Sequence, residues 1–503
     1  IVGNLVTVYN DQKINQPIAD SVFDSKIVSV YDKGANKKDS TYWTASRPIP
    51  LNEEEVKDYI KKDSIRLVDE DPLRKDSLRR RSNRPKLNDL LLSGYRYRGK
   101  DDKLVLTTNT VLTGLINFNT VEGWNTAPRI RTDFKLDSFN TLSVVTALRY
   151  GFGNKHFNGI ARVNYVKQNR DWLGRWWLMG VEGGKYVFQY NPYNPIQPLY
   201  NSISTLFYRK NYLKIYERWN ATAFVQRNFG NGLRINFQAG FQDRIPLENT
   251  SDFSYAREGV GGFTDNIPDE FRKYTWERHN AFITKIIAAY QPGYTYTKYP
   301  DYMAPHASNM PVFTIGYEKG IPGLLGSKTN YDKWRFGIKD DINLNLLGKV
   351  GYNVGTGGFL NTRYVGIPDL NHIQGNQLGV AVSYLEGFQL APYYSFSNQE
   401  RLYGEAHIEW QLRGFLTNKI PLFRKLSWYL VTGANAYYAS KDIYHNEVFV
   451  GLDNIGYGVF RLFRVDYVWG WNSLDKSVSA VRLGISTNSI FNFNAAENST
   501  TEW

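Results

Sequence analysis

The chain has 503 residues, among them 13 Trp, 36 Tyr, 28 Phe and 42 Gly, and it contains no Cys. The absence of Cys excludes disulfide frameworks, Cys-ligated zinc and thiol nucleophiles. No stretch approaches the roughly 18–20 uncharged apolar residues of a transmembrane helix, so a helical membrane protein is excluded. The net charge of +13 would suit a polyanion or an anionic lipid surface as a partner.

The first 85 residues differ in composition from the rest of the chain. They hold 16 Lys or Arg, 14 Asp or Glu and six aromatic residues, whereas the other 418 residues hold 79 charged and 71 aromatic residues. We therefore divide the chain into a water-exposed leader (1–85), an aromatic-rich body (86–493) and a C-terminal tail (494–503) without alternation.

One helix is expected in the leader, over residues 53–66. Asn52 can cap its start, and the three glutamates that follow favour the positive end of the helix dipole. Val56, Tyr59 and Ile60 then form a narrow apolar stripe, which must pack on something. We predict that these three side chains are buried, either on the rim of the body or on a partner protein.

A basic run in the leader, Arg79 to Arg81 with Arg84, could suggest nucleic-acid binding. It lacks interleaved aromatic residues and belongs to no nucleic-acid recognition fold, and Asp76 lies close by. Nucleic acid is therefore not expected as a partner.

The body shows alternation of apolar and polar residues with a period of two. The clearest segments are 129–136, 156–165, 233–242, 336–346, 405–413 and 461–469. Such alternation predicts antiparallel strands with one apolar and one polar face. A soluble sandwich would show the same alternation, so other features must decide.

Three features favour a membrane. The strands are near ten residues long, which suits a tilted bilayer crossing; opposite charges pair on the polar face; and aromatic residues gather at strand ends. Short turns at 137–140, 153–155 and 230–232 alternate with long polar segments at 245–275 and 291–330. The sequence predicts an all-β protein, a transmembrane antiparallel β-barrel of about 16 strands preceded by a short charged leader with one helix.

Charged residues of the polar strand faces are candidates for a network inside the barrel. They are Glu405, His407, Glu409, Arg413, Arg464 and Asp466. In the first three, neighbouring members lie about 6.5–7 Å apart along one strand, too far for adjacent members to hold one metal without a bend. A structural charge network is preferred, and no metal or cofactor is expected.

Enzymatic motifs are missing from the sequence. It contains no Gly-x-Ser-x-Gly, no His-Glu-x-x-His and no phosphate loop. The Gly-rich stretch 355–358 opens no helix and is expected to be a barrel kink. A hydrolase hidden inside the barrel stays open as an alternative, but a non-enzymatic protein is expected.

Five segments resemble an uncharacterised Bacteroidota family of outer-membrane barrels. They are YWTASRPIPL (42–51), FNTVEG (118–123), YGFGNKH (150–156), NYLKIY (211–216) and VDY (465–467). The resemblance spans essentially the whole chain. It implies an outer-membrane barrel usually preceded by a small carboxypeptidase-regulatory-like β-domain.

A second stretch is similar to a loop motif of the outer-membrane protein assembly (BamA-like) and two-partner secretion barrels. It contains His372, Gln374, Gly375 and Asn376. The similarity implies a loop that folds into the barrel. In those barrels the motif carries an Arg that pairs with an inward acidic residue, and here Gln374 occupies the Arg position.

These observations leave three functions. The first is a non-enzymatic anchor or accessory subunit in outer-membrane protein assembly, secretion or envelope biogenesis; the others are a passive or specific solute channel and a barrel-embedded hydrolase. The expected location is the outer membrane of a Gram-negative bacterium, with the leader in the periplasm. The expected partners are the lipid bilayer, lipopolysaccharide and proteins of the assembly or secretion machinery.

Overall fold

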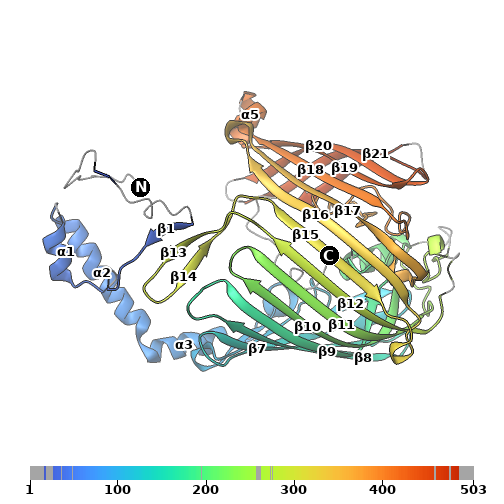
Figure 1. Cartoon of the computed structure of the whole chain (residues 1–503), viewed down its shortest axis with the longest axis horizontal. Coiled ribbons are helices and arrows are strands. Elements are labelled where there is room, and N and C mark those ends of the chain that lie inside the picture. Colours follow the sequence, from blue (N-terminus) through green and yellow to red (C-terminus); the bar gives the residue numbers. More distant parts are fainter. Residues whose placement is uncertain are drawn as a thin grey trace.

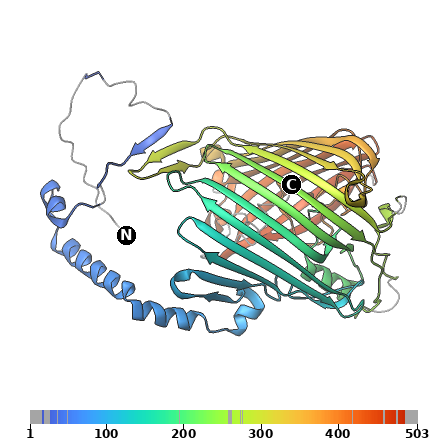
Figure 2. The same cartoon turned by 60° about the horizontal axis from the view of Figure 1, so that its bottom comes forward.

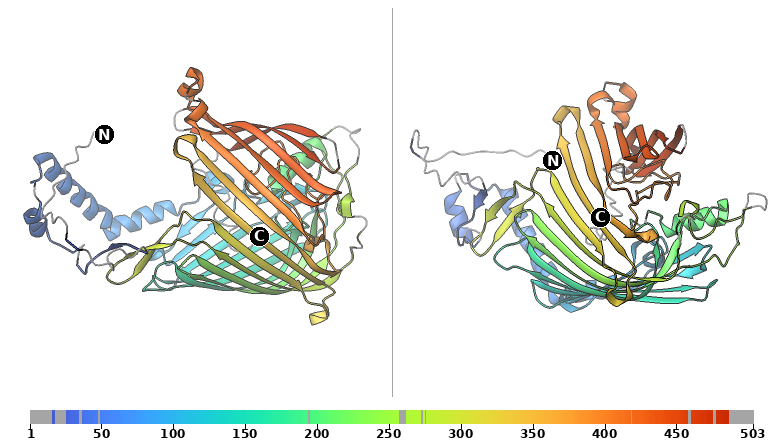
Figure 3. Two further views of the ribbon diagram at one scale, coloured as in Figure 1. Left: turned by 45° about the horizontal axis from the view of Figure 1, so that its top comes forward. Right: turned by 45° about the vertical axis from the view of Figure 1, so that its right-hand side comes forward.

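The computed structural model describes residues 16–17, 26–34, 37–47, 49–193, 195–256, 262–271, 274, 276–417, 419–457, 460–474 and 477–485. Most of the body is strand, and its strands form one large antiparallel sheet that curls strongly (Figures 1 and 3). The predicted all-β body is confirmed. The predicted tail, 494–503, lies outside the described residues, and within them no helix combines the length and apolarity of a membrane span.

Each strand of the large sheet pairs with the next one along it. In this order the strands are β2 (Arg96–Arg98), β3 (Leu104–Thr108), β6 (Arg129–Lys135), β7 (Asn140–Gly151), β8 (Phe157–Gln168), β9 (Arg175–Gln189), β10 (Ile215–Phe229), β11 (Leu233–Ile245), β12 (His279–Tyr290), β15 (Val312–Gly320), β16 (Asn330–Asn343), β17 (Lys349–Tyr364), β18 (Tyr403–Arg413), β19 (Tyr429–Ser440), β20 (Ile443–Tyr457), β21 (Phe460–Asn472) and β22 (Val478–Ile485). β4 (Ile116–Asn119) and β5 (Gly123–Thr126) form a hairpin that pairs with the end of β7. Among the described residues no strand pairing joins β2 or β3 to β22, so the curled sheet is open along one side (Figure 3).

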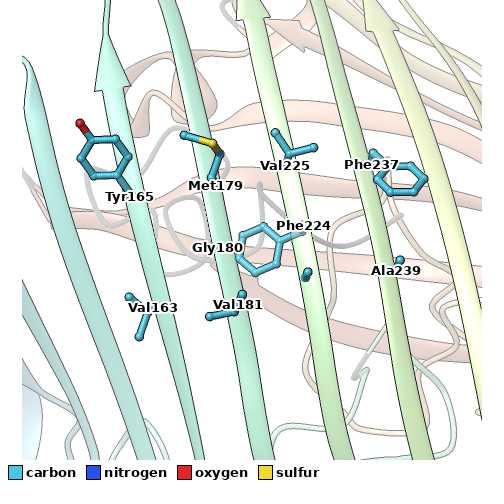
Figure 4. A pocket seen from close by; sticks show the side chains of 10 residues that line it. Val163, Tyr165, Met179, Gly180, Val181, Phe224, Val225, Phe237 and Ala239 are labelled. Atoms are coloured by element: carbon cyan, nitrogen blue, oxygen red, sulfur yellow. The ribbon is translucent and has the colours of Figure 1, made fainter.

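The outer face of the sheet is apolar. Two cross-strand rows on β8 to β11 are Val163, Val181, Ala223 and Ala239, and then Tyr165, Met179, Val225 and Phe237. These rows line a shallow apolar depression of about 510 Å³ (Figure 4). Side chains at period two on neighbouring strands share one face of a sheet, which explains why local alternation builds a continuous apolar band.

The connections divide between the two ends of the sheet. The leader enters at one end, together with the turns after β6, β8 and β10, and the long β9–β10 and β11–β12 connections lie at the other end. The predicted turn at 153–155 joins β7 to β8 and therefore lies at the end opposite the turns at 137–140 and 230–232. The segment 291–330 is not one loop, because it contains β13 (Thr295–Lys298), β14 (Met303–His306) and the sheet strand β15.

The helices lie outside the sheet or in its connections. They are α1 (Ser40–Ser46), α2 (Glu53–Glu70), α3 (Pro72–Ser82), α4 (Pro198–Tyr208), α5 (Gly414–Thr417) and α6 (Pro421–Leu426). The predicted leader helix is confirmed as α2, which starts with a capping box between Asn52 and Glu55. The helix continues beyond residue 66, and α3, which starts with Pro72, was not predicted.

The leader contacts the body through a strand. β1 (Ile27–Val30) pairs in parallel with β13, and β13 pairs with β14, so the leader adds one strand to a hairpin between β12 and β15 (Figure 2). Tyr31 extends this contact, since its N–H donates to the Lys298 carbonyl at 2.8 Å and its ring stacks on Tyr299.

The predicted burial of the α2 stripe on the body is wrong. Val56, Tyr59 and Ile60 are 41%, 52% and 62% exposed, and α2 has no buried residue. β1 supplies the leader with main-chain hydrogen bonds to the body, so the helix does not need to pack there. The burial of the stripe on a partner protein stays a prediction.

Candidate functional site

A long connection between β17 and β18, residues 365–402, lies on the inner face of the curled sheet. We call it the inner segment. Its apolar residues Ile373, Phe388 and Phe396 are almost fully buried and pack against Tyr403 and Tyr437 of the inner strand faces. The inner segment therefore has a hydrophobic core of its own with the sheet.

The first anchor of the inner segment is a buried ion pair. Arg244 of β11 donates two hydrogen bonds to Asp369, both at 2.6 Å. Lys333 of β16 donates to the carbonyl of Leu370 at 3.1 Å. A bidentate Arg–carboxylate pair is strong and directional, so it fixes this end of the inner segment.

The second anchor is a carboxylate that accepts from the main chain. Glu447 of β20 accepts hydrogen bonds from the backbone N–H groups of Gln389 and Leu390, at 2.8 and 2.6 Å. Arg482 of β22 donates to the Gln389 carbonyl at 2.7 Å. Two strands near the open side of the sheet thus hold the same point of the inner segment.

Two further contacts complete the attachment. The Tyr437 hydroxyl accepts from the amides of Asn371 and Asn398, at 2.7 and 2.8 Å. The backbone of 379–381 pairs with Leu483 of β22, where the Ala381 N–H donates to the Leu483 carbonyl at 2.7 Å. The inner segment therefore covers part of the free edge of β22.

The inner segment also needs a glycine where it returns to the sheet. Gly358 in β17 has a φ of +156°, and a Cβ there would lie 2.1 Å from the Arg401 carbonyl oxygen. The Phe359 N–H donates to the Glu400 carbonyl at 3.0 Å. Gly358 of the 355–358 stretch thus permits a close backbone approach inside a strand.

The predicted loop-motif residues all lie in the inner segment, where they fold it on itself. The Gln374 carbonyl accepts from the Phe388 N–H at 2.8 Å, and a Cβ at Gly375 would lie 2.5 Å from the Ala391 carbonyl oxygen. Buried Asn376 donates through its side chain to the Val380 carbonyl at 2.7 Å. The ion pair between this region and the sheet is made by Asp369 and Arg244, which the sequence did not point to.

His372, the remaining loop-motif residue, is fully enclosed. Its Nε2 donates to the Ile367 carbonyl at 2.8 Å, and its Nδ1 accepts from the Ser397 hydroxyl at 2.7 Å. Burial lowers the pKa of His372 to about 3. The imidazole is therefore neutral near pH 7 and crosslinks the two ends of the inner segment.

The predicted network residues form two adjacent groups on the inner face. Arg464 donates to Asp466 at 2.8 Å and to Glu409 at 2.7 Å, and all three side chains are buried. His407 contacts Glu405 at 2.9 Å. The guanidinium of Arg464 also lies 4.4 Å from the ring centroid of Tyr384, a residue of the inner segment.

Arg413, predicted as a member of this network, lies outside it. The register of β18 against β19 shifts between Gln411 and Arg413, and Arg413 has a φ of +45° at the strand end. Its side chain is exposed. The prediction assumed that the alternation of β18 continues to Arg413, but the register shift after Gln411 ends it.

A metal site is not formed by these groups. Within the part of the chain that the structure describes, no cluster of three or more His, Asp or Glu could hold a metal ion. His407 is engaged by Glu405, and Glu409 by Arg464. The ion pairs join β18 to β21, and Arg464 and His407 also contact the rings of Tyr384 and Phe388 of the inner segment.

Fold and interior together define a curled antiparallel sheet with an apolar outer face and an inner face occupied by a chain segment. Residues 88–452 match the "Family of unknown function (DUF5686) C-terminal domain". The match covers more than half of the chain, and the protein belongs to this family.

Several solved structures are similar at low identity. CdiB from Acinetobacter baumannii is 10% identical, with 73% of this chain and 58% of CdiB covered and a TM-score of 0.34. BamA from Haemophilus ducreyi lacking POTRA domains 1–3 is 9% identical, with 81% and 82% covered and a TM-score of 0.39. Wzi of Escherichia coli, a carbohydrate-binding barrel involved in group 1 capsule assembly, is 8% identical, with 77% and 78% covered and a TM-score of 0.28. The chain thus spans little more than half of CdiB, and it matches no curated protein sequence.

Proposed function

We propose that the protein is a transmembrane β-barrel of the outer membrane. The observation that carries this proposal is the inverted burial of β21. Its exposed face is apolar and aromatic: Phe463, Val465, Tyr467, Trp469 and Trp471. The buried face of the same strand carries Arg464 and Asp466, which are 2% and 0% exposed. A strand that hides its charges and exposes its aromatic rings is suited to a lipid environment.

The proposed barrel contains about 16 strands closed between its first and last strands. In a bilayer an unpaired sheet edge is costly, because lipid offers no hydrogen-bond partner. The leader enters at the end with the turns after β6, β8 and β10, and barrels of this kind place short turns in the periplasm. We therefore place the leader in the periplasm. The segments quoted above support a Bacteroidota outer membrane, and a preceding carboxypeptidase-regulatory-like domain is part of the same proposal.

Within the membrane, the protein is proposed to act as an anchor or accessory subunit in envelope biogenesis, without catalysis. The inner segment occupies the interior and is held by β11, β16, β19, β20 and β22, which is a poor arrangement for an open channel. The proposed partners are the bilayer, lipopolysaccharide and proteins of the assembly or secretion machinery, and no cofactor is proposed.

Removal of the inner segment should convert a weak conductor into an open pore. Asn376 and Ala391 are hydrogen-bonded neighbours, so residues 377–390 can be replaced by Gly-Gly without stretching the chain. We expect single-channel currents in planar bilayers to rise at least threefold over those of the unaltered protein. The matched control removes 296–305 from the β13–β14 hairpin outside the interior, and its currents should stay unchanged. Large currents from the unaltered protein would favour the solute channel.

The accessory role can be tested by changing the α2 stripe. Substitution of Val56, Tyr59 and Ile60 by Ser should leave the barrel folded, because all three side chains are exposed. We expect the amount of co-purifying envelope protein, measured by quantitative mass spectrometry after detergent extraction, to fall at least fivefold. The control replaces the exposed residues Lys57, Lys61 and Asp63 of the same helix by Ser. Equal recovery of partners by both variants would argue against a role for the stripe.

A further inference from the structure

The connection between β18 and β19 combines basic and apolar residues and lacks acidic ones. Residues 413–428 read RGFLTNKIPLFRKLSW, a sequence that contains no Asp or Glu. They include α5 and α6, and we call them the basic connection. Its four cations, all exposed, are Arg413, Lys419, Arg424 and Lys425. In the part of the chain that the structure describes, none of the four pairs with a carboxylate, so their charge is available to an anionic partner.

The basic connection lies at the leader end of the sheet. From β10 to β18, each strand of the large sheet pairs antiparallel with the next, in six successive pairings. β18 therefore runs in the same direction as β10. Because the turn after β10 lies at the leader end, the connection after β18 lies there as well, and α5 extends beyond the strand ends (Figure 1).

The strand register places the start of the basic connection next to the outer face. Trp410, near the end of β18, pairs with Thr432 of β19. Thr432 pairs with Val450 of β20, and Val450 pairs with Tyr467 on the exposed face of β21. Register partners share one face of a sheet, so the Trp410 side chain lies on the outer face. Arg413 follows three residues later, at most about 10 Å further along the chain, so the cations begin where the apolar outer face ends.

Exposed apolar side chains accompany the cations. They are Phe415, Leu416 and Ile420 in the basic connection, and Leu344, Leu346 and Leu347 in the turn between β16 and β17. This turn, residues 344–348, carries no charge, and α5 lies beside it. The Trp410 indole N–H donates to the Leu347 carbonyl at 2.9 Å, which joins the turn to the outer face. Leu346 is 86% exposed, so the turn presents an apolar surface with no cover from the described residues.

This combination of residues suits the boundary between lipid and water. Trp side chains prefer the level of the lipid headgroups. Apolar side chains of interfacial segments enter the acyl boundary, while Lys and Arg stay among the headgroups and attract anionic lipids. An acidic protein would match the cations alone. The continuity of the apolar side chains with the outer face therefore favours lipid as the partner.

We propose that the basic connection and the β16–β17 turn bind anionic phospholipids of the periplasmic leaflet. The four cations pair with the headgroup phosphates, and the exposed apolar side chains enter the acyl boundary beside them. This inference rests on the proposed membrane location and on the periplasmic position of the leader.

Native mass spectrometry of the full chain in a non-ionic detergent tests the role of the cations. The probes are dioleoyl phosphatidylglycerol, dioleoyl phosphatidylethanolamine and inorganic phosphate. We expect selective retention of phosphatidylglycerol, and a rise of at least tenfold in its Kd when Arg413, Lys419, Arg424 and Lys425 are all replaced by Gln. The matched control replaces four exposed cations of the leader, Lys57, Lys61, Lys75 and Arg84, by Gln, and its Kd should stay within twofold of the unaltered protein.

A single cysteine tests the contact of the apolar side chains with lipid, because the chain contains no other Cys. Leu416→Cys is labelled with an environment-sensitive fluorophore in liposomes of the two phospholipids. We expect lipids with a nitroxide on the acyl chain to quench this label at least twofold more than a label at Lys61→Cys on the exposed helix α2.

Three results would overturn the lipid site. The first is equal phosphatidylglycerol binding by the four-cation variant and the unaltered protein. The second is inorganic phosphate that binds as tightly as the lipid, which would indicate a soluble anion site. The third is equal quenching at both cysteines, which would indicate a water-exposed surface suited to an acidic protein.

Insertion into liposomes and the heat-modifiable folded band are measured for every variant. Failure of the unaltered protein to insert would count against the membrane location itself. Normal insertion without selectivity for phosphatidylglycerol would count against the lipid site alone.

Discussion

Replacement of Arg464 by Ala is expected to lower the free energy of unfolding by about 3–5 kcal/mol, because it leaves two buried carboxylates without their cation. Arg464 holds Asp466 on its own strand and Glu409 on β18, so the loss affects two strands. It also removes the cation that lies over Tyr384 of the inner segment. Urea unfolding of the folded protein in detergent micelles, followed by tryptophan fluorescence, measures the change.

A charge-free variant is the control for this experiment. Arg464→Met combined with Glu409→Gln and Asp466→Asn leaves no unpaired charge, and we expect it to recover most of the lost stability. Equal destabilisation by the single and the triple variant would mean that packing around Arg464, rather than the unpaired carboxylates, sets the cost.

Phe237→Arg is expected to cost about 2–4 kcal/mol, the range for an Arg placed on the lipid face of a barrel near the bilayer midplane. Phe237 is 44% exposed and lies in the outer apolar row with Met179 and Val225 (Figure 4). We expect the heat-modifiable folded band to be lost after refolding into liposomes, measured by electrophoresis without boiling.

The neighbouring residue provides the matched control. Gln238 points to the opposite face and pairs in register with Lys285 of β12, so Gln238→Glu places a carboxylate beside a cation. We expect this variant to fold like the unaltered protein. If Phe237→Arg folded as well as Gln238→Glu, the outer face would not be in lipid.

The strands were predictable because their signal is local. A strand that separates apolar from polar surroundings must alternate at period two, and this pattern is visible without any knowledge of the neighbours. The same pattern identified the Arg464–Asp466 and Glu405–His407 pairs, whose members are two residues apart on one face. It failed at Arg413, since a change of register leaves no trace in the alternation.

The sequence indicated where the inner segment lies in the chain, but it did not predict the contacts that attach the segment to the sheet. Its strongest anchor joins Arg244 to Asp369, which are 125 residues apart, and no local spacing connects them. The leader was misjudged for a related reason. An amphipathic helix is conspicuous in a sequence, whereas the short strand Ile27–Val30 docks through main-chain atoms that every residue has.

The two attachments of the leader have a consequence for any protein that binds it. β1 is fixed to β13, and Asn83 is fixed to Arg98 of β2, so the helices between them form a loop tethered at both ends. The helices of such a loop can move only within a limited distance of the two attachment points, unlike a tail that is attached at one end. A partner captured by the α2 stripe would therefore be held at high effective concentration beside the leader end of the sheet, and weak affinity for the stripe would suffice for stable recruitment.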